Sequence, residues 1–246
     1  MQRTVTSAVL VFAAIMTCAR PAHAQQTLNF TLGYFSPLGV DARVAGDTLV
    51  VAQRHLIFDV GDFGGTSVGG EWLVPLGDFF EAGAGVSYSQ QTVPSVYADY
   101  IDSDGTEVDQ DLQLRRVPIA FTFRVLPLGQ RSPVQPYFGA GLGIVNWRYR
   151  ESGEFIDFNA GLEIFEDSFE ATGTSAGPIV LGGLRFAGRT ASAGGEIRWQ
   201  HADGDLPNDF AGSRIELGGW TYNFTVGLRF GTRDSGLGTR DSGSGR

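Results

Sequence analysis

The chain has 246 residues, a formal net charge of −9, 35 glycines and one cysteine, and all 18 of its basic residues are arginine. This acidity argues against nucleic acid or an anionic membrane surface as the main partner, because like charges repel. A chain of this length and glycine content can form one all-β domain without a linker. The composition therefore leaves the question of which solvent the apolar side chains of that domain meet.

The first residues have the pattern of an export signal. Arg3 begins a charged segment, residues 5–16 are apolar, and Ala22-His23-Ala24 has the small-x-small pattern of a cleavage site. We predict a signal peptide over residues 1–24, so that the mature protein leaves the cytoplasm.

An alternative cut before Cys18 would produce a lipoprotein, but Thr17 is larger than the residue that such sites favour. Cleavage after Ala24 removes the cysteine, so the mature chain cannot form a disulfide. It also removes Arg3 and Arg20, which brings the formal charge to −11.

The segment at 220–230 alternates large apolar residues at even positions with small or polar residues at odd positions. Side chains of a strand alternate between its faces, so this segment has one apolar and one polar face. Seven further segments show the same alternation, over about 27–35, 66–75, 79–90, 112–127, 135–150, 178–187 and 191–201. In the fifth strand the pattern changes phase at Val145, where we predict a β-bulge.

The connections between these eight strands alternate in length. The long ones cover about 36–65, 91–111, 151–177 and 202–214, and the short ones cover about 76–78, 128–134 and 188–190. Long loops at one end and short turns at the other are typical of membrane barrels. We predict an all-β fold, an eight-stranded antiparallel up-and-down transmembrane β-barrel over residues 25–230. A soluble lipocalin-like barrel is the alternative, but its apolar side chains would point inward.

The two faces of the predicted strands carry different chemistry. Aromatic residues near both strand ends predict two girdles at the membrane surfaces, represented by Trp72, Tyr88, Trp147, Trp199, Trp220 and Phe230. Charged residues on the opposite face predict a lumen network of Glu71, Glu81, Arg116, Arg124, Arg185, Glu196, Arg198 and Arg229. Since an eight-stranded barrel is just wide enough to be filled by side chains, Arg–Glu pairs would plug it.

The chain resembles the eight-stranded outer-membrane β-barrels of the OmpA-like, OmpX-like and opacity-protein (porin-like) type. The resemblance rests on the leader, on the sequence Pro-Tyr-Phe-Gly-Ala-Gly-Leu-Gly at 136–143, and on a last strand that ends in the aromatic residue Phe230. It implies a place in the outer membrane of a Gram-negative cell envelope. The chain departs from the family in its tail at 231–246, which contains Gly-Thr-Arg-Asp-Ser-Gly twice and for which we predict disorder.

No pattern of an active site is found in the sequence. The mature chain has two histidines, His55 in a predicted loop and His201, which Ala202 and Asp203 follow where a deacylase-like barrel would need a serine. The acidic stretch around Asp102 fails the match to a calcium loop, because Tyr100 stands at its first position. We predict no enzymatic activity, no catalytic residues, no cofactor and no metal site.

The predicted function is a structural or surface-interaction role in the outer membrane, with a plugged lumen. A narrow channel or transporter for small or apolar solutes is the alternative, and an envelope-modifying enzyme is disfavoured. The expected partners are outer-membrane lipid and lipopolysaccharide, the barrel-assembly machinery and a surface ligand at the outer loops, with no nucleic acid, and the protein is expected to be a monomer. Apolar residues in the outer loops, such as Leu49, Phe58 and Phe155, predict a packed cap or a binding surface.

Overall fold

The protein forms a closed antiparallel barrel in a computed structural model that describes residues 25–102, 105–157 and 161–231. The predicted signal peptide and residues 232–246 of the predicted tail lie outside the described residues. The strands of the ring are β1 (Gln26–Pro37), β3 (Gly65–Pro75), β4 (Phe80–Ile101), β5 (Glu107–Val125), β6 (Val134–Asp157), β7 (Glu163–Ala187), β8 (Ala191–Gln200) and β11 (Gly219–Phe230).

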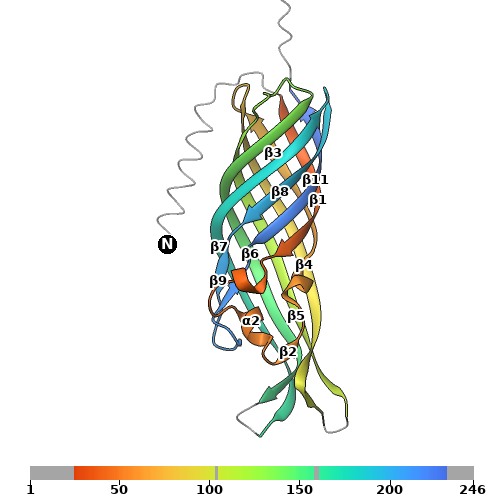
Figure 1. Ribbon diagram of the computed structural model, residues 1–246, viewed down its shortest axis with the longest axis vertical. Helices are drawn as coiled ribbons and strands as arrows, with labels where there is room; N and C mark the ends of the chain where they lie inside the picture. The colour runs from red at the N-terminus through yellow and green to blue at the C-terminus, as the bar shows by residue number, and fades with distance from the viewer. Residues whose placement is uncertain (1–24, 103–104, 158–160, 232–246) are drawn as a thin grey trace, which may run out of the picture.

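Each strand of the ring pairs with its neighbours in sequence, and the β1–β11 pairing closes the ring (Figure 1). The first and last strands are joined along their whole length, from Gln26 opposite Phe230 to Pro37 opposite Gly219. This is the predicted eight-stranded up-and-down barrel. No helix among the described residues is long and apolar enough to cross a membrane.

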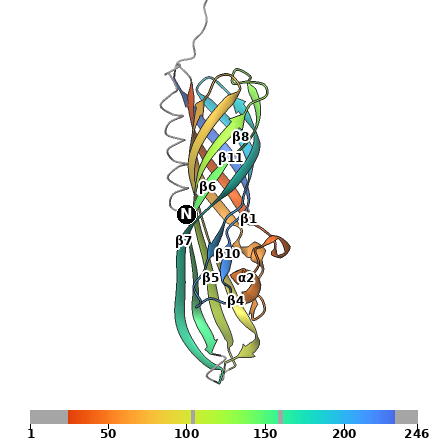
Figure 2. The same ribbon diagram turned by 90° about the vertical axis from the view of Figure 1, so that its left-hand side faces the viewer.

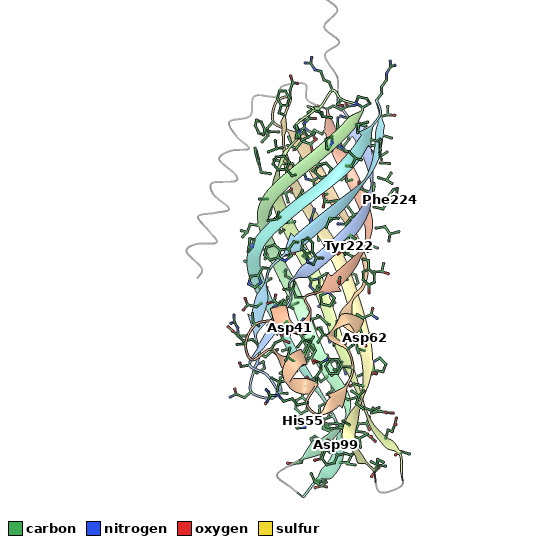
Figure 3. All side chains as sticks on the ribbon, viewed as in Figure 1. Asp41, His55, Asp62, Asp99, Tyr222 and Phe224 are labelled. Carbon is green, nitrogen blue, oxygen red and sulfur yellow. The ribbon has the colours of Figure 1, made fainter. Side chains whose placement is uncertain are left out.

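A belt of apolar side chains covers the outside of the ring. Phe30, Leu32, Phe224 and Leu228 are each more than half exposed, and Tyr222 and Phe224 project from β11 (Figure 3). A continuous belt of exposed apolar residues around a closed barrel is stable in a lipid bilayer and not in water. The molecule is therefore a transmembrane β-barrel of the outer membrane.

The barrel is much longer on one side than on the other (Figures 1 and 2). Strands β4 to β7 continue past the ends of β8, β11, β1 and β3 and project from the long-loop end, which faces the exterior in this architecture. The predicted loops at 91–111 and 151–177 are therefore wrong over most of their length. Those residues extend the β4–β5 and β6–β7 hairpins. The two hairpins pair with each other through β5 and β6, from Gln110 opposite Gly153 down into the membrane part.

Strand β5 shows why these extensions were not recognised. Within the membrane its outward side chains are apolar, as in Val117 and Phe121, while Arg116 and Arg124 point inward. Beyond Arg116 the two faces exchange polarity, since Leu114 and other apolar side chains are buried inside while acidic and polar residues face solvent. A strand that leaves the bilayer keeps its alternation of faces and inverts which face is apolar.

The same inversion explains the phase change in β6, where the predicted bulge is wrong. The register of β6 with both neighbours is unbroken through Val145, which faces Pro118 on β5 and Ser175 on β7. Val145 and Trp147 point inward, and Trp147 is 4% exposed, so its predicted place in the girdle is wrong as well. The register shift of this half lies instead in β4, between Val96 and Ile101.

Two long loops close the open side of the projecting sheet. The first contains the short helices η1 (Val40–Ala42), α2 (Thr48–Ala52) and η2 (Val60–Phe63) and the strand β2 (Leu56–Ile57). The second contains the small hairpin of β9 (Asp203–Asp205) and β10 (Arg214–Glu216). Both lie on one side of β4–β7, with α2 and β10 adjacent in Figure 2. We call these two loops the cap.

Candidate functional site

The centre of the membrane part of the lumen holds a cluster of two arginines and two glutamates from three strands. Arg124 on β5 pairs with Glu71 on β3 and lies 2.8 Å from Glu196 on β8. Arg198, also on β8, is 2.8 Å from Glu196 and 3.4 Å from Glu71. The two positive and two negative charges cancel, so the cluster, which we call the central ion-pair cluster, carries no net charge.

Neighbouring side chains extend the central ion-pair cluster toward the short-turn end. The Tyr137 hydroxyl donates to Glu196 at 3.2 Å, and the Arg124 guanidinium lies 4.8 Å from the centre of the Tyr137 ring. The Arg185 guanidinium lies 6.0 Å from the centre of the same ring, is 2.7 Å from Glu81 and donates to the Gln135 side chain at 2.8 Å. These two ion-paired groups therefore form successive layers across the lumen.

Burial makes the two layers strongly dependent on each of their members. Arg124 is 1% exposed and Glu196 is 3% exposed. Removing one partner of such a buried pair leaves the other charge uncompensated in a medium of low dielectric constant. The layers also occupy the cross-section of a barrel that is just wide enough to be filled by side chains. The two layers therefore place buried, charge-paired side chains across the membrane part of the lumen.

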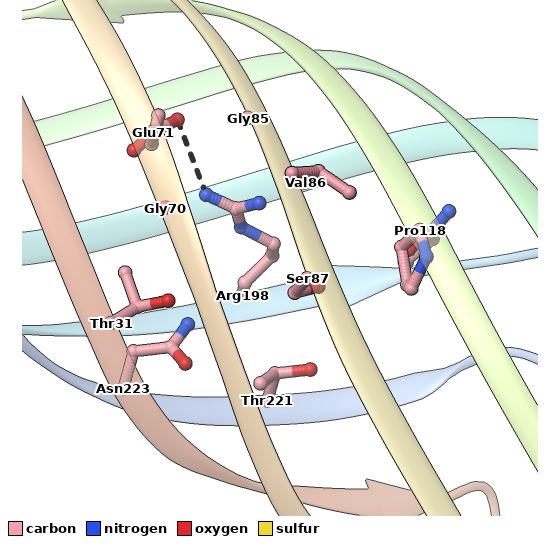
Figure 4. A pocket seen from close by; sticks show the side chains of 11 residues that line it. Thr31, Gly70, Glu71, Gly85, Val86, Ser87, Pro118, Arg198, Thr221 and Asn223 are labelled. Atoms are coloured by element: carbon pink, nitrogen blue, oxygen red, sulfur yellow. Dashed lines mark hydrogen bonds and ion pairs between the residues drawn. The ribbon is translucent and has the colours of Figure 1, made fainter.

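A small polar chamber lies beside the central ion-pair cluster (Figure 4). Its volume is about 30 Å³, and Thr31, Ser87, Asn223, Arg198 and Glu71 are among the residues that line it. A cavity of this volume holds about two water molecules. A chamber of this volume is too small for an organic solute.

The structure separates two of the predicted lumen residues from these layers. Arg116 is 4% exposed, and its guanidinium lies 3.6 Å from the centre of the Phe35 ring, in cation–π contact. Arg229 is near the short-turn end, where it donates to the Gly188 carbonyl at 2.9 Å. All eight predicted lumen residues thus point inward, and five of the remaining six are buried, Arg198 being slightly more exposed.

Above the charged layers the interior changes to an apolar core. The core contains residues of the projecting strands and of both cap loops, including Leu49, Phe63, Val93, Leu112, Leu114, Val145, Trp147, Tyr149, Phe210, Ile215 and Leu217. The Trp147 indole N–H donates to Ser175 at 3.1 Å, and the Tyr149 ring packs on Phe210 of the cap. Apolar residues predicted to be loop residues therefore pack as a cap over the exterior end of the barrel.

Asp47 joins the two cap loops. Its carboxylate accepts from the Leu49 N–H at 3.0 Å and pairs with Arg43 at 2.9 Å. It also accepts from the Glu216 N–H at 2.6 Å, and Arg43 donates to the Glu216 carbonyl at 2.9 Å. Sequence reasoning missed this connection because the loops are distant in sequence, although Asp47 directly before Thr48–Ala52 is the helix-capping residue that its position suggests.

The remaining predicted girdle residues lie on the outer face of the ring. Trp72, Tyr88, Trp220 and Phe230 are between 43% and 47% exposed, and the Trp72 indole donates to Gln26 at 3.1 Å. Trp199 is half-buried and stacks on the His201 ring with centroids 6.3 Å apart. Outward-facing aromatic side chains of this kind are favoured at the two interfaces of a bilayer.

The two histidines lie in the cap half of the molecule, outside the central ion-pair cluster. His55 follows α2, and His201 lies 3.5 Å from the Glu216 carboxylate and 3.9 Å from that of Asp203. In the described part of the chain, no group of three or more His, Cys, Asp or Glu side chains is arranged to hold a metal ion.

Glu216 gives the cap a pH dependence. Burial raises the pKa of the Glu216 carboxyl, although the Gly218 N–H, His201 and Arg43 oppose the shift. A raised pKa means that the folded cap prefers the protonated carboxyl, so this contribution to stability is present below the ordinary value of 4.5 and is lost as the pH rises through the higher folded value.

We therefore expect Glu216→Gln to stabilise the cap relative to the wild type above that pH range and to have little effect below it. Hydrogen exchange of cap amides from pH 4 to pH 8 measures the difference. An advantage of Glu216→Gln that shrinks as the pH rises would contradict the assignment.

Comparison with known proteins gives likeness in fold alone. The sequence matches no protein-family model and no curated protein. Among solved structures, the E. coli outer membrane protein W is 14% identical, with 86% of this chain and 100% of that chain covered and a TM-score of 0.43. The outer membrane protein AlkL is 15% identical, with 87% and 95% covered and a TM-score of 0.42.

The N-terminal β-barrel domain of Pseudomonas aeruginosa OprF is also 15% identical, with 83% of this chain and 97% of that chain covered and a TM-score of 0.34. The closed strand register and the outer apolar belt of the chain itself establish it as an eight-stranded outer-membrane β-barrel.

Proposed function

We propose that the protein is a closed, non-enzymatic outer-membrane barrel with a structural and surface-interaction role. The observation that carries this proposal is that two groups of buried side chains lie in series along the interior, the ion-paired layers around Arg124 and the apolar core around Trp147. A channel needs a continuous hydrated path, and the cavity beside Arg198 has room for about two water molecules only.

The proposed environment follows from the same surfaces. The outer belt contacts lipid, and the solvent-exposed cap and hairpins stand where the outer leaflet carries lipopolysaccharide. We infer that the barrel is inserted as a monomer by the barrel-assembly machinery and that Phe230 contributes to recognition from a position inside the sequence. The projecting hairpins are the part of the molecule available to a ligand at the cell surface.

Solute uptake into vesicles tests the closed barrel. Purified protein refolded into liposomes is expected to leave them impermeable to small sugars and amino acids, as in liposomes without protein. Folding of the same sample is checked by heat-modifiable gel mobility. Uptake that depends on folded protein would instead support the alternative of a narrow transporter for small solutes.

A further inference from the structure

We propose that the tips of the two projecting hairpins bind a basic, amphipathic peptide segment of a partner protein. The β4–β5 and β6–β7 hairpins stand side by side at the exterior end of the molecule (Figures 1 and 2). This deepens the surface-interaction role proposed above and rests on it. The binding site is a groove of about 530 Å³ between the tips, lined by Ile101, Asp102, Glu154, Leu162, Ile164, Phe165 and Glu166.

The apolar residues of this groove are exposed outside the membrane belt. Ile101 is 69% exposed, Leu162 is 48% exposed and Phe165 is 39% exposed. Most other apolar residues of the exterior half are buried in the cap core. The Phe165 ring stacks on Phe155, with centroids 5.9 Å apart, so it presents a fixed apolar surface rather than a free side chain. Exposed apolar surface of this kind is typical of a site that a partner covers.

The carboxylates of the groove are placed against one another. In the β6–β7 register Glu154 and Glu166, which both line the groove, stand directly opposite each other. Like charges directly opposite each other on neighbouring strands are destabilising. A guanidinium or ammonium group between Glu154 and Glu166 would remove this repulsion and gain two charge-assisted hydrogen bonds.

The sequences of the two hairpins supply no such cation. Residues 96–111 and 151–170 contain no arginine and no lysine. The nearest arginines of the β6–β7 hairpin are engaged, since Arg148 pairs with Glu170 and Arg150 donates to Ser168 at 2.9 Å. The complementary charge that the hairpins lack is what a basic partner would bring.

The exposed apolar side chains and the carboxylates of the groove together indicate which kind of ligand fits. A second copy of the chain would bring equally acidic tips together, and lipid phosphates or nucleic acid would be repelled in the same way. The groove volume suits a few side chains rather than a globular surface. The fitting ligand is a peptide segment in which an arginine or lysine stands next to a bulky apolar residue.

Fluorescence anisotropy with a labelled peptide that alternates arginine and tryptophan tests the proposal, using the full barrel refolded in a zwitterionic detergent at 0.15 M salt. We expect saturable binding to the wild type and at least tenfold weaker binding to Glu154→Gln/Glu166→Gln. The matched control, Asp111→Asn/Asp205→Asn, removes the same charge from exposed positions outside the groove and is expected to bind within twofold of the wild type.

A second variant tests the apolar half of the groove. Phe165→Ser keeps every charge and is expected to weaken binding several-fold, and heat-modifiable mobility shows that each variant is folded. If the control variant weakened peptide binding as much as Glu154→Gln/Glu166→Gln does, binding would depend on net charge alone, and the proposal would be overturned. Absence of saturable binding to the wild type, binding of Ca²⁺ without the peptide, or a groove-dependent dimer would overturn it as well. Solute uptake by the wild type would overturn the closed barrel and leave this result unaffected.

Discussion

Replacing Arg124 with alanine is expected to lower the free energy of unfolding by about 3–5 kcal/mol, the range for breaking a buried ion pair on one side. Arg124 contacts Glu71 and Glu196 and is almost completely buried, so its removal leaves two carboxylates in the lumen with Arg198 as the neighbouring cation. Urea unfolding of the refolded barrel in detergent micelles measures the change.

A second arginine of the same strand offers the control for this experiment. Arg115 faces outward on β5, where it is half-buried, and Arg115→Ala is expected to change stability by less than about 0.5 kcal/mol. Arg124→Met combined with Glu71→Gln tests the cause, since it removes one charge of each sign, keeps the Arg198–Glu196 pair and is expected to recover part of the lost stability. An Arg124→Ala barrel as stable as Arg115→Ala would contradict the role of the central ion-pair cluster.

Trp147→Ala is expected to have the second large effect, a loss of about 3–5 kcal/mol in the exterior half, because it leaves a cavity in the apolar core. Trp147 is 4% exposed and lies over Gly173 on β7 and Gly204 on β9, where the closeness of the ring leaves no space for a Cβ. Loosening of the core is expected to speed proteolysis of the cap loops while the membrane part stays inserted.

Trp220→Ala is the matched control, because it removes the same side chain from the outer wall and is expected to leave proteolysis of the cap unchanged. Brominated lipids distinguish the two positions directly, because they quench the fluorescence of an indole in the bilayer. Quenching attributable to Trp220 but not to Trp147 is expected. Strong quenching of Trp147 would show that its indole contacts lipid and would contradict its place in the apolar core.

The membrane part could be predicted from the sequence because the lipid bilayer requires the same alternation of apolar and polar residues in every strand. Bilayer lipid outside and a polar lumen inside give each strand a continuous apolar face, and this located all eight strands, the closure of the ring and the inward direction of Arg124. The pairing of Arg124 with Glu196 could not be predicted, because β5 and β8 meet only across the lumen, at a depth set by the tilt of the strands.

The exterior half could not be predicted by the same rule, because there water surrounds the outer face and the apolar core fills the inside. Val145 and Trp147 continue the inward face of β6. Only the polar residues Asn146 and Arg148, which alternate with them on the outward face, indicate that the strand has left the bilayer. Had both faces been compared, the phase change at Val145 would have indicated this exchange of polarity instead of a bulge. The connection through Asp47 and Glu216 depends on two loops meeting in space, which no local pattern specifies.

The central claim, a lumen closed by paired charges and an apolar cap, is tested most directly by single-channel recording of the refolded wild-type protein in a planar bilayer. We expect no steady conductance from protein that gel mobility shows to be folded. A steady conductance of the wild type that is lost or altered in Arg124→Ala or Glu71→Ala would contradict the claim, because it would show that ions pass through the central ion-pair cluster.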